Sequence, residues 1–469
     1  MKLKITILGA FALAAGMIAL QACVENDETG EISLTVQPQD LPGSFSGDTD
    51  FKFPEKESVI TGWLGSQDSE KITKHAWGIW QGLTSKSDQV YNDQALLVYQ
   101  TWLGASDLAK ACANGDTDAG CNVHKTNVEM LDHPNQHHHA FGGSAGENAD
   151  IDPSLYVTVS YSPGAACYAT SNLIFNQSII TSKMNGSGGI GTIDPFPNNG
   201  VTIKPTYYIG KKSDKYIRIP AWKGPPLDSA QSYGPKKWKS YVYADVSNSQ
   251  TAGKIAVPTT QASGNPPANA IVNLNEFIQY SLDQAAADYM NEEQGTGQLT
   301  LEEGDLAVLV AMHVATKEMS NWTWQTFFWT TNPSSPDFPS SSAEAALMPS
   351  DLTGAASHYA VSSSYAMVWP NQPVTGGTNE GVTAHVGYNP YLEAGLSGPF
   401  GNENKLNSAY QYGMQSNCMS CHAQAATNDT AGFFGYTADQ YIDMSDTMFN
   451  GWVQLDFAWS IQGNINKNK

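Results

Sequence analysis

Residues 305–329 have the sequence DLAVLVAMHVATKEMSNWTWQTFFW, two apolar runs separated by a polar turn. In the first run, Leu306, Val308 and Val310 alternate with residues that are themselves apolar, so neither face of the run is polar. This pattern predicts a central strand that is buried on both faces of a sheet. His313 lies within the strand, either as a core histidine or as a ligand.

Further elements are predicted on both sides of this segment. Amphipathic spacing predicts helices, whereas alternation or a short apolar run predicts strands. The strands outnumber the helices, so the sequence predicts an α+β fold with a large β-rich domain and several helices. The expected helices span residues 67–83, 106–113 and 275–290, and the expected strands span 155–161, 201–209, 215–219, 241–246 and 322–329.

The charge of the chain restricts its partners. The 469 residues include 24 Lys and Arg against 45 Asp and Glu, a formal net charge of −21. Such an acidic surface argues against a protein that binds nucleic acid or anionic lipid through its own surface. It favours a partner protein with a basic surface.

The N-terminus has the features of an export signal. Lys2 and Lys4 precede the apolar stretch 5–20, which is followed by Ala22 and Cys23. This arrangement resembles the bacterial lipoprotein signal, which implies cleavage before Cys23 and a lipid anchor on that residue. The resemblance implies an exported protein of the cell envelope, at the outer membrane or a periplasmic face, that contacts the membrane through its lipid alone.

The sharpest chemical motif is Cys418-Met419-Ser420-Cys421-His422, which has the C-x-x-C-H pattern of a c-type haem attachment site. Two thiols at this spacing on a short helix can add to the two haem vinyl groups, and the histidine that follows can ligate the iron. A redox pair or half of a zinc site are the alternatives, but the sequence has no second C-x-x-C. We therefore expect one covalent haem c.

The position of the motif predicts how the haem is housed. The sequence that follows His422 is too short to fold alone, so the C-terminal haem c segment should pack onto the large domain. The expected organisation is a signal peptide (1–22), an N-terminal tether (23–55), a β-rich α+β domain (56–335) and a cytochrome c-like haem-binding region (336–469) integrated with it.

The sequence does not decide which residue is the sixth ligand of the iron. A helix predicted over residues 437–449 would present Met444 and Met448 on one face, and methionine is a common ligand of electron-transfer haems. A methionine pair at helical spacing is also ordinary core. An open sixth position is another possibility and would favour chemistry over electron transfer. The alternative ligands are His313, His358, His385 and the run His137-His138-His139.

Three cysteines remain. Cys112 and Cys121 are nine residues apart and are expected to form a local disulfide in an exported chain, which leaves Cys167 as a lone buried thiol. Residues 132–139 have a metal-binding composition, although adjacent histidines on one loop cannot all face one ion, so a solvated polar loop is the alternative.

The chain also resembles a family of large, mostly uncharacterised exported bacterial proteins with a single haem c site near the C-terminus. The resemblance implies a mono-haem cytochrome and names no substrate, and the shared pattern does not fix a downstream methionine. The matching stretches are residues 75–80, 100–102, 313–327, 389–393, 417–423 and 456–460.

Two functions follow from these features. The first is a lipid-anchored mono-haem c-type cytochrome that transfers single electrons in the cell envelope. The second is a haem-dependent oxidoreductase, an oxidase, peroxidase or dehydrogenase, that acts on a small molecule bound by the upstream domain. A surface-displayed binding protein with haem as a structural element is a third. The large upstream part of the chain favours the second function, because an electron shuttle does not need so large a domain.

Overall fold

The computed structural model describes residues 25–26, 32–33, 36–45, 50–122, 125, 130–134, 152–184, 186, 188–224, 234–294, 299–394, 417–429 and 441–465. The predicted signal peptide (1–22), Cys23 and the run His137-His138-His139 lie outside these residues.

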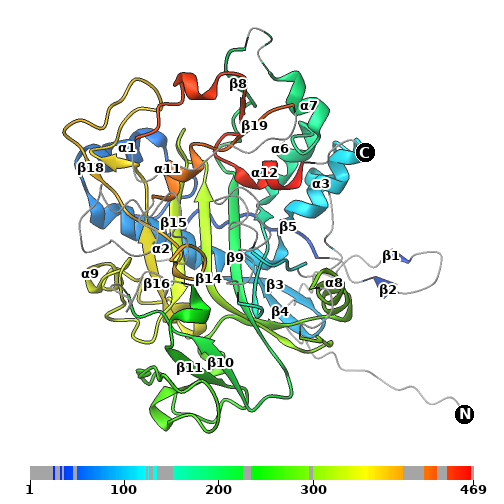
Figure 1. Cartoon of the computed structure of the whole chain (residues 1–469), viewed down its shortest axis with the longest axis vertical. Coiled ribbons are helices and arrows are strands. Elements are labelled where there is room, and N and C mark those ends of the chain that lie inside the picture. The colour runs from blue at the N-terminus through cyan, green and yellow to red at the C-terminus, as the bar shows by residue number, and fades with distance from the viewer. Residues whose placement is uncertain are drawn as a thin grey trace, which may run out of the picture.

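The centre of the molecule is an eight-stranded sheet built on the segment 305–329 (Figure 1). β14 (Leu306–Thr316) lies between β9 (Val201–Gly210) and β15 (Thr323–Trp329), antiparallel to both, as a central strand should. The register shifts once along β14, where a bulge between Leu309 and Ala311 interrupts pairing with β9. The sheet is completed by β16 (Tyr359–Ser363), β7 (Ser160–Tyr161), β5 (Leu103–Gly104), β6 (Leu155–Val157) and β13 (Gln279–Ser281).

Both faces of β14 are covered, which explains why neither face of its sequence is polar. On one face lies α2 (Ser69–Leu83), whose Trp80 stacks on Phe327 with ring centroids 4.5 Å apart. Toward one end of the other face lie α11 (Cys418–His422) and the other C-terminal elements, near the top of Figure 1. The α+β class with a β-rich core is confirmed, and strand β16, beyond residue 335, pairs with β15 in the same sheet.

Smaller elements surround the sheet, and none of the described helices has the length and apolar character needed to cross a membrane. Further helices are α1 (Glu57–Gly65), α3 (Ala105–Ala113), α4 (Ala119–Asn122), α6 (Pro163–Ser171), α7 (Gln177–Ser182), α8 (Gln284–Gln294), α9 (Ser342–Ala345), α10 (Pro390–Glu393) and α12 (Trp459–Asn464). Further strands are β1 (Glu25–Asn26), β2 (Ile32–Ser33), β3 (Lys86–Tyr91), β4 (Gln94–Leu97), β8 (Gly191–Thr192), β10 (Tyr216–Pro220), β11 (Tyr241–Asp245), β12 (Ile271–Asn273), β17 (Val368–Trp369), β18 (Thr383–Ala384), β19 (Ala426–Thr427) and β20 (Val453–Gln454).

Two predicted helices differ from the structure. The segment 275–290 begins in a 3-10 turn (Leu274–Glu276) and continues into β13, which pairs with the start of β14. Helix α8 begins only after Asp283, whose side chain accepts the Ala286 N–H at 2.7 Å. In the segment 437–449, the described residues 441–446 are not helical, and only Thr447–Phe449 forms a 3-10 turn. Asp446 caps that turn by accepting the Met448 N–H.

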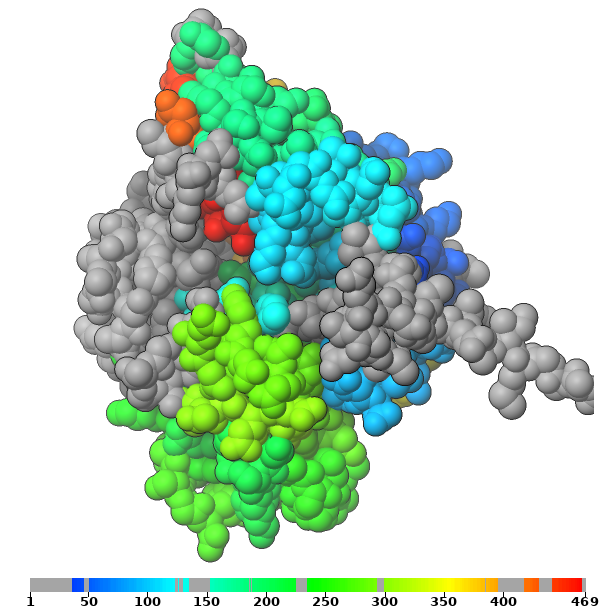
Figure 2. Space-filling model, turned by 90° about the vertical axis from the view of Figure 1, so that its right-hand side faces the viewer, coloured from blue at the N-terminus to red at the C-terminus, as the bar shows by residue number. Residues whose placement is uncertain are grey.

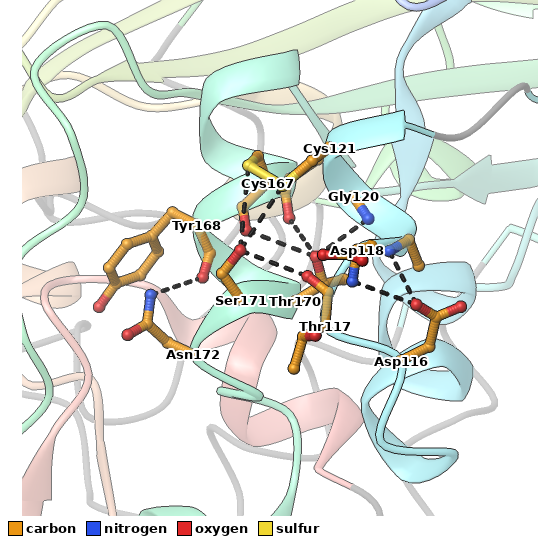
Figure 3. The surroundings of a disulfide bond; sticks show 12 residues. Asp116, Thr117, Asp118, Gly120, Cys121, Cys167, Tyr168, Thr170, Ser171 and Asn172 are labelled. Carbon is orange, nitrogen blue, oxygen red and sulfur yellow. Dashed lines mark hydrogen bonds between the residues drawn. A yellow bond between two sulfur atoms is a disulfide. The ribbon is translucent and has the colours of Figure 1, made fainter.

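The predicted disulfide is wrong: Cys121 pairs with Cys167, not with Cys112 (Figure 3). Gly120 allows α4 to approach α6 closely, because any side chain at this position would collide with the Ala166 carbonyl. This close approach places Cys121 beside Cys167, with Cα atoms 4.2 Å apart. Cys112 points instead into the core and remains a buried free thiol.

Candidate functional site

The C-x-x-C-H motif forms the short helix α11, which is held at its N-terminus by Asn417. The side-chain oxygen of Asn417 accepts the Ser420 N–H at 3.0 Å, which caps the helix. Its amide nitrogen donates to the carbonyls of Ala366 at 2.8 Å and His385 at 2.6 Å. A five-residue helix has little stability of its own, so these buried bonds fix where the motif lies.

Cys418, Cys421 and His422 all line one cavity of about 210 Å³. The cavity is lined from the sheet by residues 202–204 of β9, His313 and Ala315 of β14 and Trp324 of β15. Its lining also includes Ser106 of α3 and the exposed Gly463 of α12. Figure 2 shows this side of the molecule, where the red C-terminal residues adjoin the cyan of α3 beside a hollow.

His422 is prepared to act as a ligand through one nitrogen only. Its Nδ1 lies 2.7 Å from the carbonyl oxygen of Phe457, so the imidazole donates from Nδ1, and its other nitrogen, Nε2, has no hydrogen-bond partner among the described residues. Burial lowers the pKa of His422 to about 3, which keeps the ring neutral. Trp324 packs against the ring with centroids 4.1 Å apart and limits its rotation.

The two cysteines are free thiols in the same cavity. Burial raises the pKa of both, so they are protonated at neutral pH. The Cys418 thiol donates to the Gly387 carbonyl oxygen at 3.1 Å, and the Cys421 carbonyl accepts the Trp459 indole N–H at 3.1 Å. Burial of this kind makes a thiol a poor nucleophile, which argues against a thiol–disulfide exchange centre.

A second group of polar side chains lines the cavity from the sheet. The Nδ1 of His313 lies 2.8 Å from the Thr326 hydroxyl, and its Nε2 lies 2.6 Å from a carboxylate oxygen of Glu393. Glu393 is buried, but His313 and the Asn389 N–H hold its pKa below its usual value despite that burial. Lys204, the cross-strand neighbour of His313 on β9, also faces the cavity, and burial lowers its pKa to about 8.

The structure separates the candidates for the sixth ligand. His313 lies in the cavity, but both of its ring nitrogens are already hydrogen-bonded. Met444 and Met448 pack against a hydrophobic cluster and do not line the cavity. His358 lies at the end of a 3-10 turn and His385 stacks on Trp369, and neither lines it.

The residues of this site fit a haem c group. Such a group needs two thiols at the C-x-x-C spacing, a neutral histidine with one free nitrogen and a hydrogen-bond acceptor for the other nitrogen that orients the ring. Cys418, Cys421 and His422 with the Phe457 carbonyl supply that set inside one cavity. Among the described residues, no cluster of three or more His, Cys, Asp or Glu side chains is arranged to hold a bare metal ion.

Sequence reasoning missed Thr326, Lys204 and Glu393 as residues of the site, whereas Trp324 could be expected either to line a haem pocket or to belong to the core. Trp324 and Thr326 have the period-2 spacing of one strand face, and Lys204 continues that face on β9. This alternation was a usable signal for a polar patch on an otherwise apolar sheet. Nothing in the local sequence around Glu393 indicates that it would meet His313, 80 residues away.

The stretches that carry the sequence resemblance come together here. His313, Glu393, His422 and Phe457 belong to four of them and line one cavity. The whole chain nevertheless matches no family model, no curated protein and no solved structure. The function therefore has to be inferred from the residues of the site.

Proposed function

We propose that this chain is a mono-haem c-type cytochrome that carries single electrons, with haem bound through Cys418 and Cys421 and with His422 as an iron ligand. One observation carries the proposal: His422 lines the same cavity as both thiols, and the Phe457 carbonyl occupies its Nδ1 while no described residue is hydrogen-bonded to its Nε2. When bound, the haem would supply the one-electron redox couple. The protein's residues hold it, orient the imidazole and limit access of water.

The decisive experiment is expression in cells that attach haem to C-x-x-C-H motifs. The wild-type chain should keep its haem after denaturation and electrophoresis. Cys418→Ser should lose one thioether, the double variant Cys418→Ser/Cys421→Ser should lose covalent haem, and the mass of the wild-type protein should exceed that of the double variant by one haem.

Cys112→Ser is the control, because Cys112 is a free thiol too, but it is buried in the core and does not line the cavity. It should retain a full complement of covalent haem. Covalent haem in the double variant, or a wild-type chain without haem, would refute the proposal.

The polar wall of the cavity favours a second candidate, a haem-dependent oxidoreductase acting on a small molecule. His313, Glu393 and Lys204 are three titratable groups in the cavity that contains the motif. The pKa values of Glu393 and Lys204 are both lowered, and shifted pKa values in a cleft are typical of catalytic sites. A simple electron carrier does not need them. Ferrous and ferric spectra with and without carbon monoxide and peroxide separate the two candidates: an inert, six-coordinate haem supports electron transfer, and a haem that binds either ligand supports the enzyme.

The cellular setting is part of the same proposal. Export and a lipid on Cys23 rest on the resemblance of the N-terminus to a lipoprotein signal, and the disulfide between Cys121 and Cys167 agrees with an oxidising compartment. The acidic chain is expected to meet a redox partner with a basic surface, at a rate that falls as salt is added. Labelling of the chain with a radioactive fatty acid, abolished by Cys23→Ala, tests the anchor.

A further inference from the structure

The carbonyl that holds His422 belongs to an unusual turn. Asp456 and Phe457 both have left-handed backbone conformations, with φ angles of 46° and 69°, and the turn is closed by a hydrogen bond from the Ala458 N–H to the Leu455 carbonyl at 2.9 Å. Two adjacent residues with positive φ form the type I′ geometry that normally requires Gly, Asn or Asp. Phenylalanine is disfavoured there, so surrounding contacts must hold the turn in place.

Asp456 makes those contacts. One carboxylate oxygen accepts from Lys317 Nζ at 2.6 Å, and the other accepts the Phe196 N–H at 2.9 Å. Both members of the ion pair are nearly buried, with 7% of the Lys317 side chain and 12% of the Asp456 side chain exposed. Lys317 also donates to the Ser320 carbonyl, so it joins the turn to the connection between β14 and β15.

Lys317 and Trp324, which packs on His422, therefore belong to the same hairpin. That hairpin positions the imidazole of His422 from two sides. Trp324 contacts the ring directly, and Lys317 acts through Asp456 on the turn that presents the Phe457 carbonyl.

We propose that Lys317 and Asp456 are positioning residues that tune His422 as an iron ligand. Their ion pair holds the left-handed turn, the turn aims the Phe457 carbonyl at Nδ1 of His422, and this hydrogen bond raises the electron donation of the imidazole. A stronger donor favours ferric iron, so the pair lowers the reduction potential. This inference rests on the proposed haem function.

The direction of the effect distinguishes positioning from simple charge. If the two residues act only through space, removing the negative Asp456 raises the potential and removing the positive Lys317 lowers it. If they act through the turn, Asp456→Asn and Lys317→Met both loosen the hydrogen bond to His422 and both raise the potential. The sign of the Lys317→Met shift is therefore the critical measurement.

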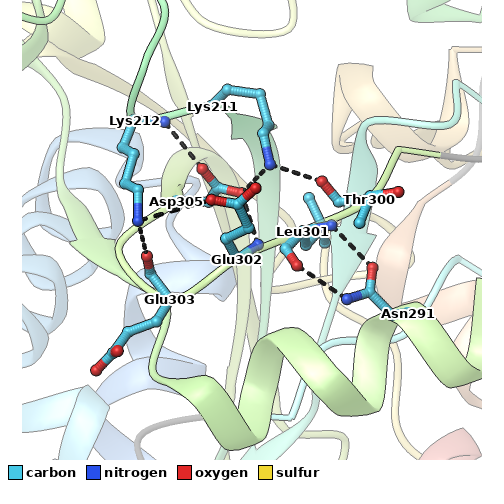
Figure 4. A network of polar contacts seen from close by, with 8 residues as sticks. All are labelled: Lys211, Lys212, Asn291, Thr300, Leu301, Glu302, Glu303 and Asp305. Carbon is cyan, nitrogen blue, oxygen red and sulfur yellow. Dashed lines mark hydrogen bonds and ion pairs between the residues drawn. The ribbon is translucent and has the colours of Figure 1, made fainter.

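The chain provides a matched control at the other end of β14. Lys211 and Asp305 form an ion pair of the same length, 2.6 Å, whose aspartate is fully buried (Figure 4). Neither Lys211 nor Asp305 lines the cavity. Lys211→Met removes the same charge as Lys317→Met and breaks a comparable ion pair, but it should leave the potential unchanged.

The experiment is a redox titration of the full-length holoprotein and its variants, followed by haem absorption. Covalent haem is first verified in each protein. A wild-type protein without haem would contradict the proposed function, whereas the potentials of variants that carry a normal haem test this inference. Mutation of a residue that hydrogen-bonds to a metal ligand typically changes metal affinity or activity by about 10- to 100-fold. A tenfold change in the ferric-to-ferrous preference corresponds to about 59 mV for one electron.

We expect Asp456→Asn and Lys317→Met each to raise the potential by at least that tenfold equivalent. Asp456→Glu is the milder variant for the case that either fails to fold: it keeps the charge but displaces the carboxylate, and it should also raise the potential. Opposite signs for Asp456→Asn and Lys317→Met, or an unchanged potential in Asp456→Glu, would overturn the inference.

Discussion

His313 and Glu393, 80 residues apart in the chain, are joined by a hydrogen bond of 2.6 Å on the wall of the cavity. Glu393 is 9% exposed, so its carboxylate depends on this partner and on the Asn389 N–H. Removing one member of a buried pair leaves the other without compensation and typically costs 3–5 kcal/mol. The pair is thus a structural element as well as a candidate for chemistry.

His313→Leu should accordingly lower the free energy of unfolding by about 3 kcal/mol or more at pH 7, since the Glu393 carboxylate loses its main partner. Urea denaturation measures the change. Lys71→Met is the control, because the pair between Lys71 and Asp68 is exposed and should contribute less than about 1 kcal/mol. Equal effects of the two substitutions would contradict the role assigned to the buried pair.

The same pair predicts a dependence on pH. The pKa of Glu393 in the folded protein is lower than its ordinary value, so its contribution is present above about pH 4.5 and is lost as the pH falls through the folded value. Unfolding curves of the wild type and Glu393→Gln should converge as the pH decreases in the acid range. A constant difference between them would contradict this linkage.

For the disulfide, the structure predicts a different pairing of cysteines from the one expected from the sequence. Cys121→Ser/Cys167→Ser should lower the free energy of unfolding by about 2–4 kcal/mol, because the bridge closes a long loop in the unfolded chain. Cys112→Ser should have a smaller effect. Peptide mapping under non-reducing conditions should recover Cys121 joined to Cys167, and a peptide that joins Cys112 to Cys121 would show the structure to be wrong here.

The long central strands β9, β14 and β15 were predictable and the disulfide was not, for physical reasons. Continuous apolar runs such as β14 are specified by burial on both faces, which leaves a local signature. The choice of partner for Cys121 depends on how closely α4 approaches α6, and that distance is set by Gly120 against Ala166, far away in sequence. The helix predicted over residues 275–290 was wrong in its first part, because β13 pairs with β14 there despite the helical spacing of the sequence.

Within the proposed site, the C-x-x-C-H residues could be singled out from the sequence because the haem attachment proposed for them requires a fixed spacing. Their surroundings could not. Glu393 reaches the cavity through the packing of α10, and the Phe457 carbonyl reaches it through a left-handed turn, and neither leaves a local sequence pattern. The hydrogen bond between His313 and Glu393 likewise depends on the fold, which places α10 beside β14. It could not be recognised from the sequence.

His385 provides a second test with pH. Burial lowers its pKa to about 4, from an ordinary 6.5, and its Nδ1 has no hydrogen-bond partner among the described residues. The unfolded chain therefore takes up a proton between pH 6.5 and 4 that the folded chain does not, and stability falls over that window. His385→Phe keeps the stacking on Trp369 but cannot titrate.

Relative to His385→Phe, the wild type should lose roughly 2 kcal/mol between pH 6.5 and 4, since each unit of pKa shift corresponds to about 1.4 kcal/mol and partial exposure reduces the full effect. Denaturation of both proteins at several pH values measures the difference. Parallel profiles would indicate that His385 titrates normally.

The two methionines give the last prediction. Met444 and Met448 lie outside the cavity that His422 lines, and the backbone N–H of Met444 is bound to the Val374 carbonyl at 3.0 Å, in a turn and not on a helix facing the site. Neither side chain can reach the cavity without rearrangement of this turn. Met444→Leu and Met448→Leu, which conserve volume, should each leave the ferric and ferrous haem spectra unchanged and cost less than about 1.5 kcal/mol. Loss of a near-infrared methionine–iron band in either variant would show that the C-terminal segment rearranges when haem is attached.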